Sequence, residues 1–191
     1  MSTPNTFFPL RVDHVHPYAL WGNAFTATEC EQIIELGNSI NLKNAKTIGE
    51  NDLRKSQISW LFPNNESQWI FERISYIVSD LNDRYFDFNL YGLAEGLQFT
   101  KYQEPDNEYR QHTDRLFRTI TRKLSISIQL SDPTSYDGGD LCLYQEETPT
   151  RLPKEQGTLI IFPSFMLHEV KKVTQGTRYS LVAWVTGEPF K

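Results

Sequence analysis

The sequence predicts a mainly β protein with supporting α-helices, of the jelly-roll class. After about residue 90 the chain consists of many short strand-like segments at fairly even spacing, separated by turn residues, which is typical of a sandwich or barrel. Before residue 90 lie two segments with helical periodicity. Helices grouped ahead of the strands are expected to brace one face of a sheet.

Two helices and one strand are expected in the first half of the chain. Thr28 and Glu31 have the Ser/Thr-x-x-Glu spacing of a capping box, so they predict a short helix that ends at Gly37. Residues 65–85 carry apolar side chains at helical spacing and predict a longer helix. Between the two, residues 55–62 have the pattern of a strand stopped by a proline. Together these elements form a helical support over about residues 24–90.

Six strands are expected in the second half, and turn residues separate them. Residues 123–130 alternate cleanly between apolar and polar side chains, and Asp137-Gly138-Gly139 predicts a tight turn. The six expected strands cover residues 97–102, 109–114, 123–130, 140–144, 157–162 and 177–186. They predict a jelly-roll core over about residues 92–188, so that the chain 1–191 forms one domain.

Composition and charge limit the function classes. A chain of 191 residues can bury an adequate core without disulfides or a structural metal. Hydrophobic residues make up 39% and aromatic residues 13%, which indicates a folded protein rather than a disordered one. The formal net charge of −5 gives no general reason to bind nucleic acid or an anionic membrane.

Targeting features and cysteines predict a soluble, cytoplasmic protein. No apolar run approaches the ~18 residues of a membrane span, and the first residues lack the features of a secretory signal. Cys30 and Cys142 lie far apart without Cys-x-x-Cys spacing, which excludes a zinc ribbon. A disulfide between them stays open as an alternative, but two free thiols in a reducing compartment are the simpler expectation.

His112, Asp114 and His168 form the candidate metal site. Residues two apart on an extended strand point to the same face, with Cα atoms roughly 6.6 Å apart. His112 and Asp114 are therefore expected to hold one metal from adjacent corners, with His168 reaching it from another strand. Two histidines and one carboxylate leave the opposite positions open, as in non-haem Fe(II) oxygenases.

Arg178 strengthens this interpretation. It follows His168 in a predicted strand rich in apolar residues, where its charge is costly unless it is paired. A guanidinium can hold a dicarboxylate through a bidentate, charge-assisted pair. His-x-Asp alone is a weak pattern, because a histidine on a strand is more often an ordinary surface or core residue. The pattern is strong only when His168 and Arg178 follow it in this order.

Two other groups of residues have simpler interpretations. His14 and His16 would share a strand face and could bind metal, but no carboxylate or cysteine has a defined place near them. Arg115, Arg118 and Arg122 follow the metal-binding strand closely. A solvated basic stretch is the simpler interpretation of these arginines, and attraction of an acidic substrate is the alternative.

Residues 97–187 carry several short motifs in a fixed order. The first is Tyr102 followed by Tyr109-Arg110-Gln111-His112-Thr113-Asp114. The later motifs are Gly138-Gly139-Asp140-Leu141, Gly157-Thr158-Leu159-Ile160-Ile161-Phe162-Pro163-Ser164, His168-Glu169-Val170 and Gly176-Thr177-Arg178-Tyr179-Ser180. In this order they resemble the motifs of the prolyl 4-hydroxylase-like branch of the Fe(II)/2-oxoglutarate oxygenases, whose first segment reads Tyr…Tyr-x-x-His-x-Asp.

The resemblance implies a fold and a set of site residues. The fold is a double-stranded β-helix, the cupin-like jelly roll, with iron on His112, Asp114 and His168. Arg178 would pair with the distal carboxylate of 2-oxoglutarate. Tyr102 would hydrogen-bond the same carboxylate, and Ser180 is expected to help. Trp184 is a candidate wall of the pocket, although ordinary core packing is its simpler interpretation.

The resemblance also implies an activity. The expected function is that of an Fe(II)- and 2-oxoglutarate-dependent dioxygenase that hydroxylates a prolyl residue in a peptide or protein. It would use O2, convert 2-oxoglutarate to succinate and CO2 by oxidative decarboxylation, and take ascorbate as a further cofactor. The nearest alternative is a hydroxylase of a free amino acid or other small molecule. A non-catalytic jelly-roll module that binds metal is the alternative from a different class. A nucleic-acid demethylase of the same fold is disfavoured, because such enzymes carry a second arginine where this chain has Trp184.

Overall fold

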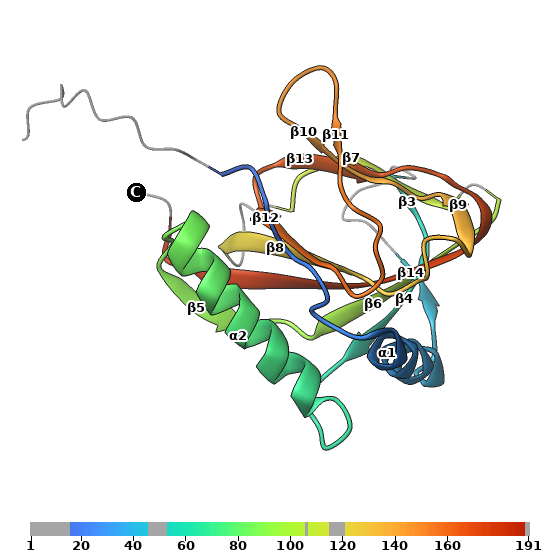
Figure 1. The fold of residues 1–191 in the computed structure, drawn as a ribbon, viewed down its shortest axis with the longest axis horizontal. Helices are drawn as coiled ribbons and strands as arrows, with labels where there is room; N and C mark the ends of the chain where they lie inside the picture. Colours follow the sequence, from blue (N-terminus) through green and yellow to red (C-terminus); the bar gives the residue numbers. More distant parts are fainter. Residues whose placement is uncertain (1–15, 46–52, 106, 115–120, 190–191) are drawn as a thin grey trace, which may run out of the picture.

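The computed structural model describes residues 16–45, 53–105, 107–114 and 121–189. Within these ranges, two β-sheets face each other and two helices cover the outer side of the larger sheet (Figure 1). This is the predicted jelly-roll arrangement with supporting helices. The two sheets remain separate and do not close into a continuous barrel.

The larger sheet has nine strands within the described ranges. They are β1 (Ala19–Trp21), β2 (Lys43–Asn44), β4 (Gln57–Leu61), β5 (Leu90–Leu93), β6 (Leu97–Gln103), β8 (Arg122–Gln129), β9 (Tyr136–Gly138), β12 (Leu159–Pro163) and β14 (Val173–Gly187). The spatial order is β1-β12-β8-β14-β6-β4-β2, and β5 and β9 also pair with β14. The long strand β14 is therefore the centre of this sheet.

The smaller sheet has five strands within the described ranges. They are β3 (Arg54–Lys55), β7 (Glu108–His112), β10 (Leu141–Tyr144), β11 (Thr150–Arg151) and β13 (Leu167–Val170). The spatial order is β11-β10-β13-β7-β3, with antiparallel pairing throughout. Strands from distant parts of the chain thus become neighbours, and β7 lies beside β13.

The six strands predicted in the second half are all present, and every end except the start of the last strand lies within two residues of the prediction. The strand predicted over residues 109–114 ends at His112, because the backbone N–H of Asp114 donates to the carbonyl of Ser164 at 3.0 Å instead of continuing the ladder. The last strand begins at Val173 rather than residue 177. The sequence did not predict several very short strands, because two to four residues are too few to show alternation.

Helix α1 (Ala27–Ser39) begins earlier than predicted. Its capping box is formed by Thr26 and Glu29, so the box predicted for Thr28 and Glu31 is wrong. Both pairs have the same spacing, and packing of the hydrophobic core determines which pair forms the cap. Phe25, just before Thr26, is fully buried in the cluster that also contains Cys30 on the first turn.

Gly37 does not end α1 but lies inside it. A Cβ at this position would meet the ring of Phe99 at 2.3 Å, so the glycine lets the helix pack directly on β6. The helix continues for two more residues, to Ser39. The prediction that this glycine terminates the helix is therefore wrong. The glycine is needed here because α1 packs closely on the ring of Phe99.

Helix α2 (Gln68–Tyr85) ends where the pattern predicts but begins three residues later. The carboxamide of Asn64 accepts hydrogen bonds from the backbone N–H groups of Glu66 and Ser67, which forms a turn ahead of the helix. The helix packs its apolar face on the larger sheet through Ile70, Ile74, Ile77, Val78 and Leu81.

The buried side chains form two clusters, one on each face of the larger sheet. The outer cluster joins the helices to this sheet, and the inner cluster lies between the two sheets. Strand β8 has residues on both faces of this sheet. Its Leu124, Ile126 and Ile128 belong to the outer cluster. The alternate residues of β8 are polar and equally buried. They face the space between the sheets, where the candidate site lies.

Two further expectations concern the whole chain. Cys30 and Cys142 are both buried and free, as expected for two separate thiols. Among the described residues, neither helix is long and apolar enough to cross a membrane.

Candidate functional site

His112 and His168 are brought together by strand pairing. His112 is the last residue of β7 and His168 lies on β13, and the two residues face each other in the antiparallel register. Their ring centroids lie 4.1 Å apart. The two histidines, far apart in the sequence, thus share one site, as the sequence predicts.

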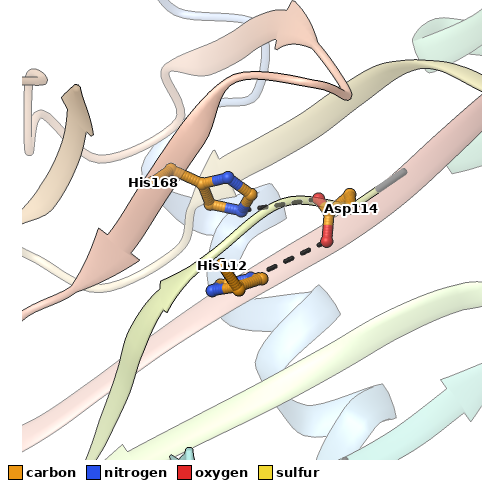
Figure 2. A group of neighbouring side chains, drawn as sticks. All are labelled: His112, Asp114 and His168. Atoms are coloured by element: carbon orange, nitrogen blue, oxygen red, sulfur yellow. Dashed lines mark ion pairs between the residues drawn. The ribbon is translucent and has the colours of Figure 1, made fainter. Parts of the chain in front are cut away.

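Backbone carbonyls fix the orientation of both imidazoles. The Nδ1–H of His112 donates to the carbonyl of Arg110 at 2.7 Å, and the Nδ1–H of His168 donates to the carbonyl of Met166 at 2.9 Å. A neutral imidazole that donates through Nδ1 keeps a lone pair on Nε2. Both Nε2 atoms point toward the carboxylate of Asp114 and are available to bind metal (Figure 2).

Asp114 completes the group from just beyond the end of β7. Its Oδ1 lies 3.7 Å from Nε2 of His112, and its Oδ2 lies 3.5 Å from Nε2 of His168 (Figure 2). One ligand atom from each of the three residues can be chosen so that all lie within 4.8 Å of one another. The strand expected to carry Asp114 stops two residues earlier, but the predicted convergence with His112 is present.

The electrostatics of the site suit a divalent cation. Burial, followed by the influence of His168, lowers the pKa of His112 to about 4, so this imidazole is neutral at physiological pH. Burial raises the pKa of Asp114, but His168, His112 and a hydrogen bond from Ser125 outweigh it and hold this pKa below its usual value. A neutral imidazole and an ionised carboxylate are the forms that bind metal.

The donor set fits iron. Two imidazole nitrogens and one carboxylate oxygen on one side of a cation form the arrangement that non-haem Fe(II) oxygenases use. The three residues line a cavity of about 440 Å³ between the two sheets, so the opposite side of a bound ion would face open space. A metal held here keeps positions for further ligands.

Arg178 lies in the wall of the same cavity. It is 1% exposed, its Nη2 donates to Oε1 of Gln129 at 2.8 Å, and its Nη1 donates to Ser180 at 3.3 Å. Among the described residues its Nε has no hydrogen-bond partner, and no carboxylate pairs with it. A buried guanidinium with only neutral partners can accept an anionic ligand.

Tyr102 and Ser180 lie beside Arg178, as the sequence predicts. Tyr102 faces Arg178 across the β6–β14 pairing, with the guanidinium carbon 5.4 Å from the centre of its ring. Both residues are buried and line the cavity. All six residues selected from the sequence therefore gather around one cavity.

Two interpretations from the sequence need correction. Arg122 is not a solvated residue, because it is buried, lines the cavity and forms a bidentate pair with Glu95. Trp184 is not simply a core residue, because it lines the cavity and lies 3.9 Å beneath the Arg122 guanidinium. Arg115 and Arg118 lie outside the described residues.

The competing histidine pair is only partly described. His14 lies outside the described residues, and His16 is exposed and packs edge-on against Tyr85. Among the described residues, the group of three neighbouring metal-binding side chains consists of His112, Asp114 and His168 and does not include His16.

Sequence reasoning missed several residues of the cavity wall, among them Arg54 and Glu95. Arg54 lies on β3 and stacks over Tyr109, which in turn stacks on His112. Its hydrogen bonds go to Ser56, Gln98 and Thr100. Strand β3 is only two residues long and Glu95 lies in a turn, so neither position shows a pattern that would have found it.

The comparisons with known proteins agree with this geometry. Residues 97–186 match the family model described as the 2OG-Fe(II) oxygenase superfamily. A PKHD-type hydroxylase from Prochlorococcus marinus is 35% identical over 113 residues, which cover 59% of this chain and 50% of that protein. Another from Crocosphaera subtropica is 35% identical over 93 residues, 47% of this chain and 41% of that protein. The chain spans about half the length of these curated relatives or less.

Solved structures share the fold at low sequence identity. A prolyl-4-hydroxylase from Pseudomonas putida superposes with a TM-score of 0.73 at 21% identity, covering 91% of this chain and 94% of that one. A prolyl hydroxylase from Trichoplax adhaerens, in complex with a peptide of hypoxia inducible factor, gives 0.75 at 20% identity, covering 90% and 84%. Residues 97–186 of this chain therefore match the 2OG-Fe(II) oxygenase superfamily, and the chain shares its fold with the two solved prolyl hydroxylases.

Proposed function

We propose that the chain is an Fe(II)- and 2-oxoglutarate-dependent dioxygenase that hydroxylates a prolyl residue in a peptide or protein. One observation carries this proposal. The His112–Asp114–His168 group and the buried Arg178 open into the same cavity. A cosubstrate held by both would lie between them, with O2 as the oxidant of both substrate and cosubstrate and with succinate and CO2 as products of 2-oxoglutarate.

In this proposal His112, Asp114 and His168 hold the metal, and the bound iron supplies the activation of O2. The protein's part is to orient the ligands and to exclude water. Both imidazoles already have their Nδ1 atoms bonded to backbone carbonyls, so they need no rearrangement to bind through Nε2. This preorganisation favours a metal at this position.

Arg178 is the proposed anchor for the distal carboxylate of 2-oxoglutarate. Its unpartnered Nε and its neutral partners leave the positive charge uncompensated within the described residues. Tyr102 and Ser180 lie beside it, and their hydroxyl groups can donate to the same carboxylate. The anchor thereby fixes one end of the cosubstrate while the metal ligands define the other.

A prolyl substrate is supported by the cavity and by the similar structures. Tyr109, Phe162 and Trp184 contribute aromatic surface to the cavity wall, and such surface favours an apolar ring such as that of proline. The Trichoplax adhaerens structure holds a peptide fragment, which supports a peptide as the substrate class. The free cysteines agree with a cytoplasmic location, and the net charge of −5 gives no reason to expect nucleic acid as a partner.

A free amino acid or similar small molecule is the second candidate substrate, and Arg54 favours it. This arginine lines the cavity, and among the described residues it forms hydrogen bonds only to neutral groups. It could therefore pair with the carboxylate of a free substrate. Arg122, another arginine of the cavity wall, is already neutralised by Glu95.

The test incubates the protein with Fe(II), 2-oxoglutarate, O2 and ascorbate and with two substrate panels, proline-containing peptides and free amino acids. Mass spectrometry then looks for the gain of one oxygen atom. The proposal expects oxygen on a prolyl residue of a peptide. Oxygen on a free amino acid supports the second candidate. A protein that binds metal and yields neither succinate nor oxidised substrate would contradict both candidates and favour a non-catalytic module.

A further inference from the structure

Strand β8 presents a row of buried polar side chains toward the space between the sheets. Ser125, Ser127 and Gln129 alternate with Leu124, Ile126 and Ile128, which face the helices. Ser125 contacts Asp114 at one end of the row, and Gln129 contacts Arg178 at the other end. A single strand therefore reaches the metal-binding carboxylate and the proposed cosubstrate anchor.

At the metal end, Ser125 fixes one oxygen of Asp114. The Oγ of Ser125 donates to Oδ2 of Asp114 at 2.7 Å, and the serine is 1% exposed. Asp114 lies beyond the end of β7, so strand pairing does not hold it. Its backbone N–H instead donates to the carbonyl of Ser164 at 3.0 Å. The bond to Ser125 occupies Oδ2 and leaves Oδ1, which lies 3.7 Å from Nε2 of His112, for a metal.

At the other end, Gln129 holds the guanidinium of Arg178. Its Oε1 accepts from Nη2 of Arg178 at 2.8 Å, while its Nε2 donates to the carbonyl of Pro153 at 2.9 Å. These two contacts determine the orientation of the carboxamide. In a flipped amide, the NH2 group of Gln129 would face the N–H of Arg178 and its oxygen would face the carbonyl of Pro153, so that neither hydrogen bond could form. Gln129 is 1% exposed and is also paired with Ser180 across β8 and β14.

We propose that Ser125 and Gln129 are positioning residues, Ser125 for the metal-binding carboxylate and Gln129 for the anchor guanidinium. This inference rests on the proposed function. A hydroxyl or carboxamide can orient a charged group without cancelling its charge. A glutamate at position 129 would neutralise Arg178 and compete with the dicarboxylate. Because Ser125 and Gln129 are neutral, Asp114 keeps its negative charge to bind the metal and Arg178 keeps its positive charge to bind the cosubstrate.

The first test measures Mn(II) affinity by titration, without turnover. Ser125→Ala is expected to bind Mn(II) about tenfold or more weakly than wild type, and Ser125→Thr, which keeps the hydroxyl, to bind close to wild type. Ser59→Ala is the matched control, because this buried serine donates to the carbonyl of Gly37 and touches none of the site residues named above. It is expected to lower the melting temperature and leave Mn(II) affinity unchanged.

The second test measures 2-oxoglutarate binding at saturating Mn(II) in the absence of O2. Gln129→Ala is expected to weaken binding about tenfold, because Arg178 loses a hydrogen bond to a charged group. Gln129→Glu is expected to weaken 2-oxoglutarate binding more than Gln129→Ala does. A loss of packing alone would not make the glutamate variant the weaker binder. Ser59→Ala, the control of the first test, is expected to bind 2-oxoglutarate as wild type does.

The outcomes separate this inference from the proposed function. A wild-type protein that shows no Mn(II)-dependent binding of 2-oxoglutarate would overturn both. If the wild-type protein binds 2-oxoglutarate but a folded Ser125→Ala protein also binds Mn(II) as tightly as wild type, only the inference is overturned. The inference alone is likewise overturned if Gln129→Glu binds 2-oxoglutarate as tightly as wild type.

Discussion

At the scale of single residues, the site is prepared by hydrogen bonds that leave one functional atom free on each side chain. His112 and His168 are bonded through Nδ1 and keep Nε2, and Arg178 is bonded through its two Nη atoms and keeps Nε. These three residues line a cavity into which metal and cosubstrate are proposed to bind. The side chains are therefore oriented before any ligand arrives, which lowers the entropy lost on binding.

Replacing Arg178 tests its role directly. Arg178→Met is expected to raise the KM for 2-oxoglutarate by about 10- to 100-fold, since a charge-assisted hydrogen-bonded pair contributes about 1.5–3 kcal/mol. Mn(II) affinity is expected to stay unchanged, because the residue touches none of the metal ligands. Arg84→Met on α2, an exposed arginine paired with Asp80, is the control and should change neither value. An unchanged KM in Arg178→Met would exclude it as the anchor.

At the scale of secondary-structure elements, helix α1 shows how tertiary packing selects between equal local signals. Thr26/Glu29 and Thr28/Glu31 have identical capping spacing, and the structure uses the first pair. The sequence predicted the existence of the helix from its periodicity, but the start depended on Phe25, which is buried against the core. Such a long-range contact is not visible in the local pattern.

The two candidate caps can be separated by substitution. Thr26→Ala is expected to lower the free energy of unfolding by about 1 kcal/mol, because the N–H of Glu29 loses its hydrogen bond to the threonine hydroxyl. Thr28→Ala removes an exposed hydroxyl and is expected to change it by less than about 0.5 kcal/mol. Urea denaturation measures both. Equal effects would contradict the assignment of the cap.

Glu29 gives the same helix a dependence on acid. A hydrogen-bonded ion pair with Arg73 at 2.7 Å and the cap contacts outweigh burial and lower the pKa of Glu29 from 4.5 to about 2. A carboxyl whose pKa is depressed on folding stabilises the protein above its unfolded pKa, and this contribution is lost as the pH falls toward the folded value. The stabilisation is therefore present above about pH 4.5 and disappears between there and about pH 2.

The expected contribution is about 1 kcal/mol, because solvent screens this partly exposed pair. Wild type is expected to exceed Glu29→Gln in stability by this amount at pH 7, and the two proteins should converge toward pH 2. Thermal unfolding followed by circular dichroism at a series of pH values measures the difference. A difference that stays constant across this range would mean that the titration of Glu29 does not produce it.

At the scale of the whole molecule, the two sheets contribute different residues to the candidate site. The larger sheet carries the helices on its outer face and supplies Arg178, Tyr102 and Ser180 on its inner face. The smaller sheet supplies His112 and His168. The site therefore exists only where the sheets face each other, and the fold brings together residues that the chain places far apart.

The sequence predicted those parts of the site that belong to recognisable motifs. His112, Asp114 and His168 were found by spacing and order, and Arg178 by the cost of a charge among apolar neighbours. Arg54 and Glu95 could not be found, because their positions depend on how a two-residue strand and a turn pack against the cavity. Arg122 was assigned to solvent because its partner Glu95 is remote in sequence.

The most direct test of the central claim is the formation of succinate from 2-oxoglutarate, with Fe(II) and O2, by wild type and by His112→Ala. Because His112 contributes one of the three proposed metal-binding atoms, the substitution is expected to abolish iron-dependent succinate formation while the protein remains folded. Wild type is expected to form succinate slowly alone and faster with a peptide that contains the correct proline. Succinate formation by wild type that persists unchanged in His112→Ala would contradict the assignment of the metal site.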